Sequence, residues 1–457
     1  MTLDTVLRLA RSGALERAWS LFETGGYAHS SEPEALTLKA RLIKDRARRA
    51  AGGEAARLYA EAATVYESAA REGRASYPLI NAATLSLLAG KRQQAEDFAL
   101  QVLRLLDADP DEAETPYWLR ATRAEALLLL GRMPEARAAL RAAVAEAPLA
   151  WEDRAATILQ FTAICAELPC DVSWLDQLRP PRSVQYSGIM DVREGSAGAE
   201  AEIARWLEAE NVGFGFGALA AGADIWVAEA LVARGASLNV VLPCPIDAFR
   251  ERSVAAVDAA WVPRFDRLLG EAHSIDELDA APVPSPAAVR LTDAVSLGLA
   301  IHNARILQAE PLRLRLVGAG DVRDAGEGPR LTSFAVPRRS ASPDFRVDEA
   351  GSAVAMVGIA AGTAQAFDSP SEAWAAALGL AADGTPVALD YRFVGAAEAG
   401  AKTTERLMAI AGATEPGQIL TSKALAFALL AEAPKARVVP MGEVRTAEGF
   451  LPIYALL

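Results

Sequence analysis

The stretch GFGFGALAAGADIWVAEALVARGASLNVVLPCP, residues 213–245, decides the fold of the central part of this chain. It opens with alternating glycines and phenylalanines, continues as an apolar helical segment and ends in a buried apolar run. Just before it, SVQYSGIMDVREG (183–195) has the pattern of a strand and loop, and AGAEAEIARWLEAENV (197–212) that of a helix. Alternation of strands and helices predicts a parallel sheet with helices on both faces.

The loops that follow these strands form the first candidate site. Ligands of such sheets bind outside the carboxyl ends of the strands. The loops 188–195 and 218–224 follow the first two strands, and the third strand ends at Pro243. Neighbouring strands would bring backbone N–H groups and a helix N-terminus into one crevice, which suits an anion. Asp224, at the start of the helix, suits a hydroxyl-rich group such as ribose better than a phosphate.

The glycine-rich bend has a purely structural alternative. It lacks the Lys-Ser/Thr pair of a P-loop, and its glycines lie within the strand rather than at its end, unlike a dinucleotide fingerprint. A tight corner between strand and helix would use the same small residues. The pattern alone therefore leaves both a nucleotide site and a structural corner open.

The first region, residues 1–178, has the periodicity of paired helices. YWLRATRAEALLLLGRMPEARAALRAAVAEAP (117–148) places two amphipathic helices around Gly131 and resembles a tetratricopeptide repeat. YPLINAATLSLLAG (77–90) resembles the TRAF-binding region of apoptosis signal-regulating kinases. We expect an all-α array that binds a protein partner, and packing against the chain's own domains is the alternative.

The central region resembles a family of nucleotide-binding domains. YSGIMD (186–191), residues 217–245, FRERSV (249–254) and GLAIHNA (298–304) together look like the SLOG superfamily, a Rossmann-like group that includes cytokinin-activating phosphoribohydrolases. The resemblance implies a domain over 182–338 that binds a nucleotide or nucleotide-derived ligand. The implied ligand-binding residues are Gly188, Asp191, Gly217, Gly222, Asp224, Glu229 and Pro243, with Phe249 and Arg250 on the following helix.

Catalysis in this crevice is an alternative to simple binding. Enzymatic members of the family carry a Gly-Gly-Gly-x-Gly-Thr loop, whereas the corresponding segment here reads DAGEGPRLTSF (324–334), with Pro329 and Arg330 in place of small residues. We therefore expect no catalytic residue. An N-glycoside or phosphoribosyl hydrolase that uses Glu229 to activate water remains the alternative.

The last region, residues 350–457, has an α+β pattern after a polar, proline-containing linker. TERLMAIAGATEPGQILTS (404–422) and PMGEVRTAEGFLPIYAL (440–456) resemble class III nucleotide cyclase domains. Such cyclases need carboxylates that hold metal ions, but Gly362-Thr363 replaces the expected Gly-Asp pair and Lys402 replaces the expected Asn. The resemblance implies an inactive domain that forms a homodimer or regulates, with Arg406 as a helix-surface or interface residue.

Composition limits the remaining classes of function. The 457 residues carry a net charge of −13, which disfavours sequence-independent binding to nucleic acid. No apolar run approaches the roughly 20 residues of a membrane span, and the N-terminus does not resemble a secretory signal. The cysteines and histidines lack metal spacing, so we expect no metal and no certain cofactor. The resulting expectation is a cytoplasmic signalling protein, with a scaffold that binds no small molecule as a further alternative.

Overall fold

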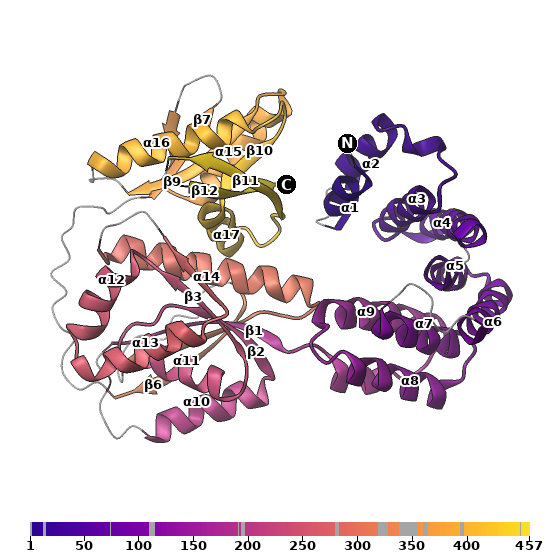
Figure 1. Ribbon diagram of the computed structural model, residues 1–457, viewed down its shortest axis with the longest axis horizontal. Coiled ribbons are helices and arrows are strands. Elements are labelled where there is room, and N and C mark those ends of the chain that lie inside the picture. The colour runs from indigo at the N-terminus through magenta and orange to yellow at the C-terminus, as the bar shows by residue number, and fades with distance from the viewer. Residues whose placement is uncertain are drawn as a thin grey trace. The chain divides into compact units, whose positions relative to one another are not determined.

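The computed structural model describes residues 2–11, 15–73, 75–108, 115–190, 192, 197–278, 283–318, 328–337, 354–359, 364–393, 397–447 and 449–457. The chain divides into two compact units, Met1–Pro180 and Pro181–Leu457. The described part of the first unit is helical, and the second unit contains two six-stranded sheets (Figure 1).

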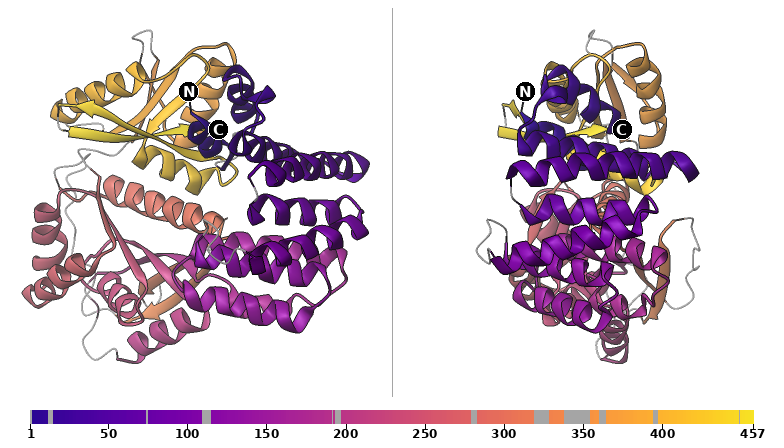
Figure 2. Two further views of the ribbon diagram at one scale, coloured as in Figure 1. Left: turned by 45° about the vertical axis from the view of Figure 1, so that its right-hand side comes forward. Right: turned by 90° about the vertical axis from the view of Figure 1, so that its right-hand side faces the viewer.

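The first unit is a succession of helical hairpins, as the sequence predicts (Figure 2). Gly90 and Gly131 follow α5 and α7 with φ of 75° and 71°, a left-handed conformation that lets glycine end a helix without strain. The buried alanines Ala124, Ala136 and Ala143 allow the backbones of neighbouring helices to approach closely. The helices are α1 (Leu3–Arg11), α2 (Leu15–Thr24), α3 (Pro33–Ala47), α4 (Gly52–Gly73), α5 (Ser76–Leu88), α6 (Arg92–Ala108), α7 (Pro116–Leu129), α8 (Met133–Glu146) and α9 (Trp151–Glu167), with short turns η1 (Tyr27–His29) and η2 (Ser173–Leu178).

A line of polar residues, here called the polar ladder, crosses this unit: buried Lys44, Asn81, Thr84 and Glu125, with partly buried Gln160. Lys44 Nζ donates to Asn81 Oδ1 at 2.9 Å. Gln160 Nε2 donates to Glu125 Oε1 at 2.6 Å, and the Thr84 hydroxyl donates to the same oxygen. Burial lowers the pKa of Lys44 to about 7 and raises the pKa of Glu125 to about 7. The ladder therefore joins α3, α5, α7 and α9 through groups that pair with one another.

The second unit begins with a six-stranded sheet in the order β4-β3-β2-β1-β5-β6, in which all neighbouring strands are parallel. One helix, α14, covers one face, and α10, α11 and α13 cover the other (Figure 1). Val240 and Val241 show the two-sided burial of β3, because they belong to the cores on opposite faces. The elements are β1 (Arg182–Gly188), α10 (Ala197–Ala209), β2 (Val212–Gly217), α11 (Ala223–Ala233), β3 (Ser237–Leu242), α12 (Ile246–Phe249), η3 (Arg250–Ala255), η4 (Ala259–Trp261), α13 (Val262–Glu271), β4 (Ser274–Glu277), α14 (Pro286–Ile306), β5 (Leu312–Gly318) and β6 (Arg330–Val336).

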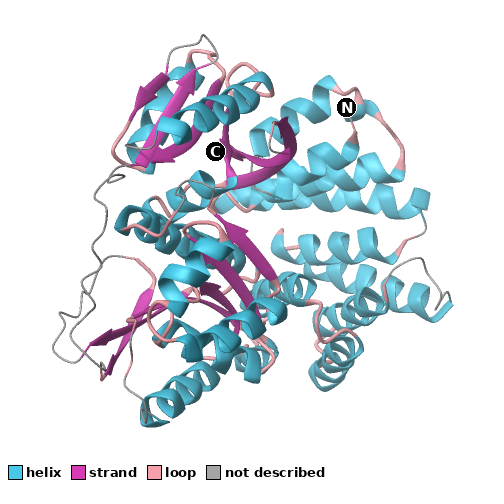
Figure 3. Cartoon of the chain, turned by 60° about the vertical axis from the view of Figure 1, so that its left-hand side comes forward, coloured by secondary structure: helices cyan, strands magenta, loops and turns pink. Residues whose placement is uncertain are grey.

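The second sheet, whose strands lie around the C-terminus in Figure 3, is mixed. Its strand order is β11-β12-β10-β9-β7-β8. Strands β9 and β10 are parallel, and the other neighbours are antiparallel. The α+β pattern of the sequence is thus confirmed as a mixed-sheet region. Its elements are β7 (Val354–Ile359), β8 (Ala364–Ala366), α15 (Pro370–Ala382), β9 (Val387–Phe393), α16 (Ala397–Gly412), β10 (Ile419–Ser422), α17 (Lys423–Glu432), β11 (Val438–Thr446) and β12 (Gly449–Leu456).

Helices α14 and α17 join the two sheets of this unit in one apolar core. Gly298 makes the contact possible, since a Cβ atom at this position would lie 1.8 Å from the carbonyl oxygen of Phe427. His302 packs edge-on against the Phe427 ring, with ring centres 5.3 Å apart, so it serves packing as the sequence predicts. Arg305 Nη1 donates to Ala436 O at 2.9 Å and extends the joint. No helix in the described ranges is long and apolar enough to cross a bilayer.

Candidate functional site at the carboxyl edge of the parallel sheet

Strand β1 lies at the point where the strand order reverses. The chain runs from β1 outward to β4 on one side and resumes at β5 on the other side. Ligand crevices of open α/β sheets form at such points, outside the carboxyl ends of the strands. The residues around the ends of β1 and β2 therefore form the first candidate site, here called the switch-point crevice.

The loops after β1 and β2 meet, as the sequence predicts. Ala223 N–H donates to Ile189 O at 3.1 Å, and Met190 and Gly222 form an isolated antiparallel bridge. A Cβ atom at Gly188 would lie 2.4 Å from Ala223 Cβ, so the glycine permits this close approach. Gly188 thus brings the start of α11 against β1.

The other two glycines also serve packing. A Cβ atom at Gly217 would lie 2.7 Å from both the ring and the carbonyl oxygen of Tyr186. Gly222 has φ of 109° and ψ of −126°, a conformation that residues with a Cβ rarely adopt. Tyr186 thus fills the space beside Gly217, whereas Gly222 is required by its backbone conformation.

The expectation of free backbone N–H groups for an anion is wrong for three amides of the second loop. Ala220 N–H donates to Asp224 Oδ2 at 3.3 Å, and Ala221 N–H donates to Ser253 O at 3.0 Å. Ala223 N–H is bonded to Ile189 O. The tight packing that brings the loops together also uses these donors.

Asp224 is one polar group that this packing leaves incompletely bonded. Its side chain is 6% exposed, and among the described residues Oδ1 has no hydrogen-bond partner of standard geometry. Burial and the nearby carboxyl of Asp293 raise the pKa of Asp224 well above its usual range, against the lowering effect of the Ala220 and Gly188 amides. Burial also raises the pKa of Asp293 to about 6, although Arg315 and Arg313 oppose the shift.

Tyr186 lies beside this carboxyl group. The Tyr186 hydroxyl is buried and has no hydrogen-bond partner in the described ranges. Burial, with a smaller effect from Asp224, raises the pKa of Tyr186 well above its usual value. A carboxyl that keeps its proton can donate and accept hydrogen bonds, so Asp224 and Tyr186 together suit a hydroxyl-bearing group.

Other residues from the sequence prediction make contacts elsewhere. Glu229 is five positions beyond Asp224, on a different face of α11, and is paired with Arg264 and with Arg267. Hydrogen bonds from these two arginines occupy both carboxylate oxygens, which counts against the use of Glu229 to activate water. No observation favours the hydrolase alternative.

Pro243, Phe249 and Arg250 belong to the segment after β3. Pro243 is buried at the end of the strand. Phe249 is buried and stacks on Phe265 with ring centres 6.1 Å apart, while Arg250 forms two hydrogen bonds of 2.8 Å with Asp266. The described contacts of Phe249 and Arg250 are thus made with α13 rather than with Asp224. Asp191 lies outside the described residues.

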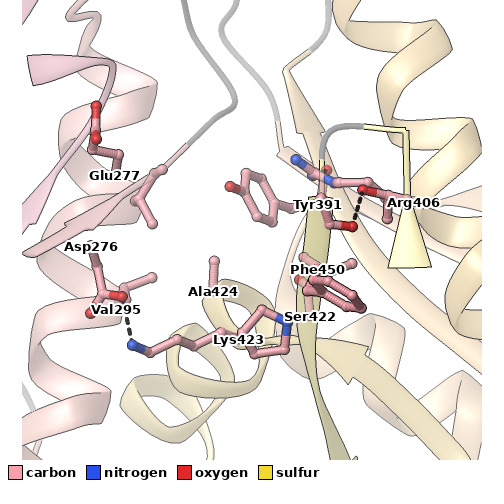
Figure 4. Close-up of a pocket in the computed structure, with 14 residues that line it drawn as sticks. Asp276, Glu277, Val295, Tyr391, Arg406, Ser422, Lys423, Ala424 and Phe450 are labelled. Atoms are coloured by element: carbon pink, nitrogen blue, oxygen red, sulfur yellow. Dashed lines mark hydrogen bonds and ion pairs between the residues drawn. The ribbon is translucent and has the colours of Figure 1, made fainter. Parts of the chain in front are cut away.

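A cavity that the sequence did not predict lies between β4 and the mixed sheet (Figure 4). It has a volume of about 230 Å³, and its lining includes residues of β4, α14, β9, α17 and β12. Lys423 Nζ contacts Asp276 Oδ1 at 2.5 Å across it. Residues more than a hundred positions apart form this cavity, here called the inter-sheet pocket, so no local pattern could indicate it.

Arg406 lines the inter-sheet pocket and corrects a prediction. We expected a helix-surface or interface residue, but its side chain is only 12% exposed. Arg406 Nε donates to Asp390 Oδ2 at 2.8 Å, and its guanidinium lies 5.1 Å from the centre of the Tyr391 ring. The fully buried Asp390 needs a cationic partner, and this explains the position of Arg406. Gly362, Thr363 and the side chain of Lys402 lie outside the described residues.

Comparison with known proteins supports the assignment of the helical unit. A family model described as Tetratricopeptide Repeats-Sensor matches residues 4–86, which span α1 to most of α5. The first helical region is therefore tetratricopeptide-like. No curated protein matches the chain.

Proposed function

We propose that this chain is a regulatory protein that recognises a hydroxyl-rich, nucleotide-derived ligand in the switch-point crevice. Oδ1 of buried Asp224, which has no hydrogen bond of standard geometry among the described residues, carries the proposal. An unsatisfied buried acceptor costs on the order of 1–3 kcal/mol, and a ribose hydroxyl would satisfy it. The three bonded amides favour recognition through the sugar rather than through a phosphate on this loop.

Entry of a ligand requires a local rearrangement. Asp224 and Tyr186 are both buried, and the bridge between Met190 and Gly222 holds the two loops together. A ligand that reaches them must separate these two loops, and this couples binding to a conformational change. Such coupling is what a regulatory protein needs in order to signal occupancy.

The helical unit supplies the other half of the proposal. Stacked helical hairpins present extended surfaces that bind proteins, and the matched family is described as a sensor. We propose that this unit contacts a protein partner. Leu149, which is 77% exposed, gives a test. The Leu149→Asp variant should recover less of a partner that co-purifies with the intact chain.

The mixed-sheet region is proposed to support a homodimer, on the cyclase resemblance. One chain has a mass of 48.2 kDa. Multi-angle light scattering of the full chain at micromolar concentration should give twice this mass. A single mass of one chain over the whole concentration range would remove this part of the proposal.

Titration calorimetry with adenosine, ribose 5-phosphate, AMP and ADP-ribose tests the ligand. At least one ribosyl compound should bind, and its 2′,3′-dideoxy analogue should bind about tenfold more weakly, which corresponds to 1.4 kcal/mol. Asp224→Asn should weaken binding, whereas Asp247→Asn, at an exposed position of α12, should not. Equal binding of the dideoxy analogue, or no binding of any compound, would refute the proposal.

A further inference from the structure

The N-terminus of α17 opens into the inter-sheet pocket. Ser422, Lys423 and Ala424 all line the pocket, and Ser422 is the N-cap residue of this ten-residue helix. An N-cap serine ordinarily accepts a hydrogen bond from the helix's own N–H groups. Here the Ser422 side chain makes no such bond.

The Ser422 hydroxyl is also without another partner. The residue is 3% exposed, and Oγ is buried with no hydrogen-bond partner in the part of the chain that the structure describes. A helix N-terminus attracts negative charge through its macrodipole and its first N–H groups. An uncommitted hydroxyl on a pocket wall beside such an N-terminus is a place for a carboxylate or another small anion.

Negatively charged side chains line the β4 side of the pocket. Asp276 and Glu277 lie at the end of β4, on the far side of the pocket from Tyr391 and Arg406 (Figure 4). Lys423 pairs with Asp276. Glu277 Oε2 accepts a hydrogen bond from Ile246 N–H at 2.8 Å, and its side chain belongs to an exposed residue. The lining thus contains two acidic and two basic side chains, which suits a ligand with both charges and no net charge.

An apolar surface completes the pocket. Phe450 lies at the pocket and is 71% exposed, whereas Tyr391 is almost fully buried. A ligand that covers the Phe450 ring would gain hydrophobic free energy that the free protein lacks. The volume of about 230 Å³ is below the roughly 300–1,000 Å³ of sites for drug-sized ligands.

We infer that the inter-sheet pocket binds an α-amino acid with an aromatic or large apolar side chain. Its carboxylate lies at the N-terminus of α17 against Ser422 Oγ, and its ammonium group faces Glu277. Its side chain packs on Phe450. This site is separate from the switch-point crevice and is independent of the function proposed for it.

Ligand-observed NMR and calorimetry on the full chain test this inference. Phenylalanine, leucine and methionine are titrated, with phenylacetate and phenethylamine as ligands that each carry one charge only. The amino acids should bind saturably, and each singly charged analogue should bind about tenfold more weakly. The Phe450→Ala and Ser422→Ala variants should each lose affinity by a similar factor.

Two variants keep the test specific. Met408→Ala also removes a large exposed apolar side chain from the mixed-sheet region, at 60% exposure, and should bind as the natural chain does. Asp224→Asn should leave amino-acid binding unchanged, because it alters only the switch-point crevice. Absence of saturable binding up to millimolar concentration, equal binding of phenylacetate, or affinity unaffected by Ser422→Ala and Phe450→Ala would overturn the inference.

Discussion

The polar ladder of the helical unit and the switch-point crevice of the parallel sheet each bury a carboxyl group, but the two groups differ in their hydrogen bonds. In the ladder, Glu125 receives hydrogen bonds from Thr84 and Gln160, and Lys44 donates to Asn81. In the crevice, one Asp224 oxygen has no hydrogen bond of standard geometry among the described residues. Buried polar groups are normally satisfied. The paired ladder therefore stabilises the fold, whereas the incomplete crevice is the better place to expect a ligand.

Removal of a ladder carboxyl should have the largest effect. Glu125→Ala removes the acceptor that Thr84 and Gln160 share and leaves a cavity in the buried core. We expect the helical unit to lose about 4 kcal/mol of unfolding free energy. Urea unfolding followed by circular dichroism measures this, with Glu135→Ala, at an exposed position of α8, as the control. A loss below that of the control would mean that the ladder does not stabilise the unit.

The pH dependence of the ladder should be the next largest effect. Glu125 keeps its proton in the folded state up to about pH 7, so its contribution to stability falls as pH rises from 4.5 to about 7. Lys44 has lost its proton in the folded state above about pH 7, while the unfolded chain keeps it to about 10.5. Its contribution therefore rises with pH over that range.

The two trends together place a stability minimum of the helical unit near pH 7, with a depth on the order of 3 kcal/mol. Chemical unfolding between pH 5 and 10 measures the curve. The double variant Lys44→Met, Glu125→Gln should flatten it. A maximum near pH 7 in the natural chain would contradict the assignment of the two groups.

A methyl group at the crevice should have an intermediate effect. The Cβ atom of Gly188→Ala would meet Ala223 Cβ, so α11 must shift away from β1. We expect a loss of about 2 kcal/mol from the second unit. Gly198→Ala is the matched control, because its Cβ position has no atom within 4 Å among the described residues beyond its own helix, and alanine favours the helix. Equal unfolding midpoints for the two variants would show that the crevice has spare room.

The smallest effect should come from Asp224→Asn. The buried carboxyl keeps its proton in the folded state over a wide pH range, so a neutral amide of similar shape replaces it with a change of about 1 kcal/mol or less. Thermal unfolding of the ligand-free chain measures this. A loss as large as that of Glu125→Ala would make Asp224 a structural residue like those of the ladder, and the contrast would fail.

The sequence was informative where one short segment determines one element. Gly131 and the alanines around it indicate a helical hairpin, and the run 213–245 indicates strand, helix and strand. Strand β4 was not predicted, because only four residues form it and its outward-facing Ile275 is 40% exposed. The pattern SIDE has no length or periodicity that distinguishes it from a loop.

The chemistry was harder to predict than the elements. Glycines 188 and 217 have the composition of a ligand loop, but Ala223 and Tyr186 occupy the space beside them. Arg406 lies on an amphipathic helix and was expected at its surface, yet its ion pair with buried Asp390 keeps its side chain mostly buried. Each outcome depends on a residue from a distant segment, and this is why spacing along the chain could not reveal it.

The contact at Gly298 has a practical consequence for dissecting the molecule. Backbone lies against backbone where α14 meets α17, and the two helices share one core with residues of both sheets. Cleavage of the chain between the two sheets would expose the apolar faces of α14 and α17, one on each fragment. Exposed apolar faces of this kind favour aggregation. The two sheets therefore depend on each other for burial of their apolar surface. A residue larger than glycine at position 298 would push α14 and α17 apart.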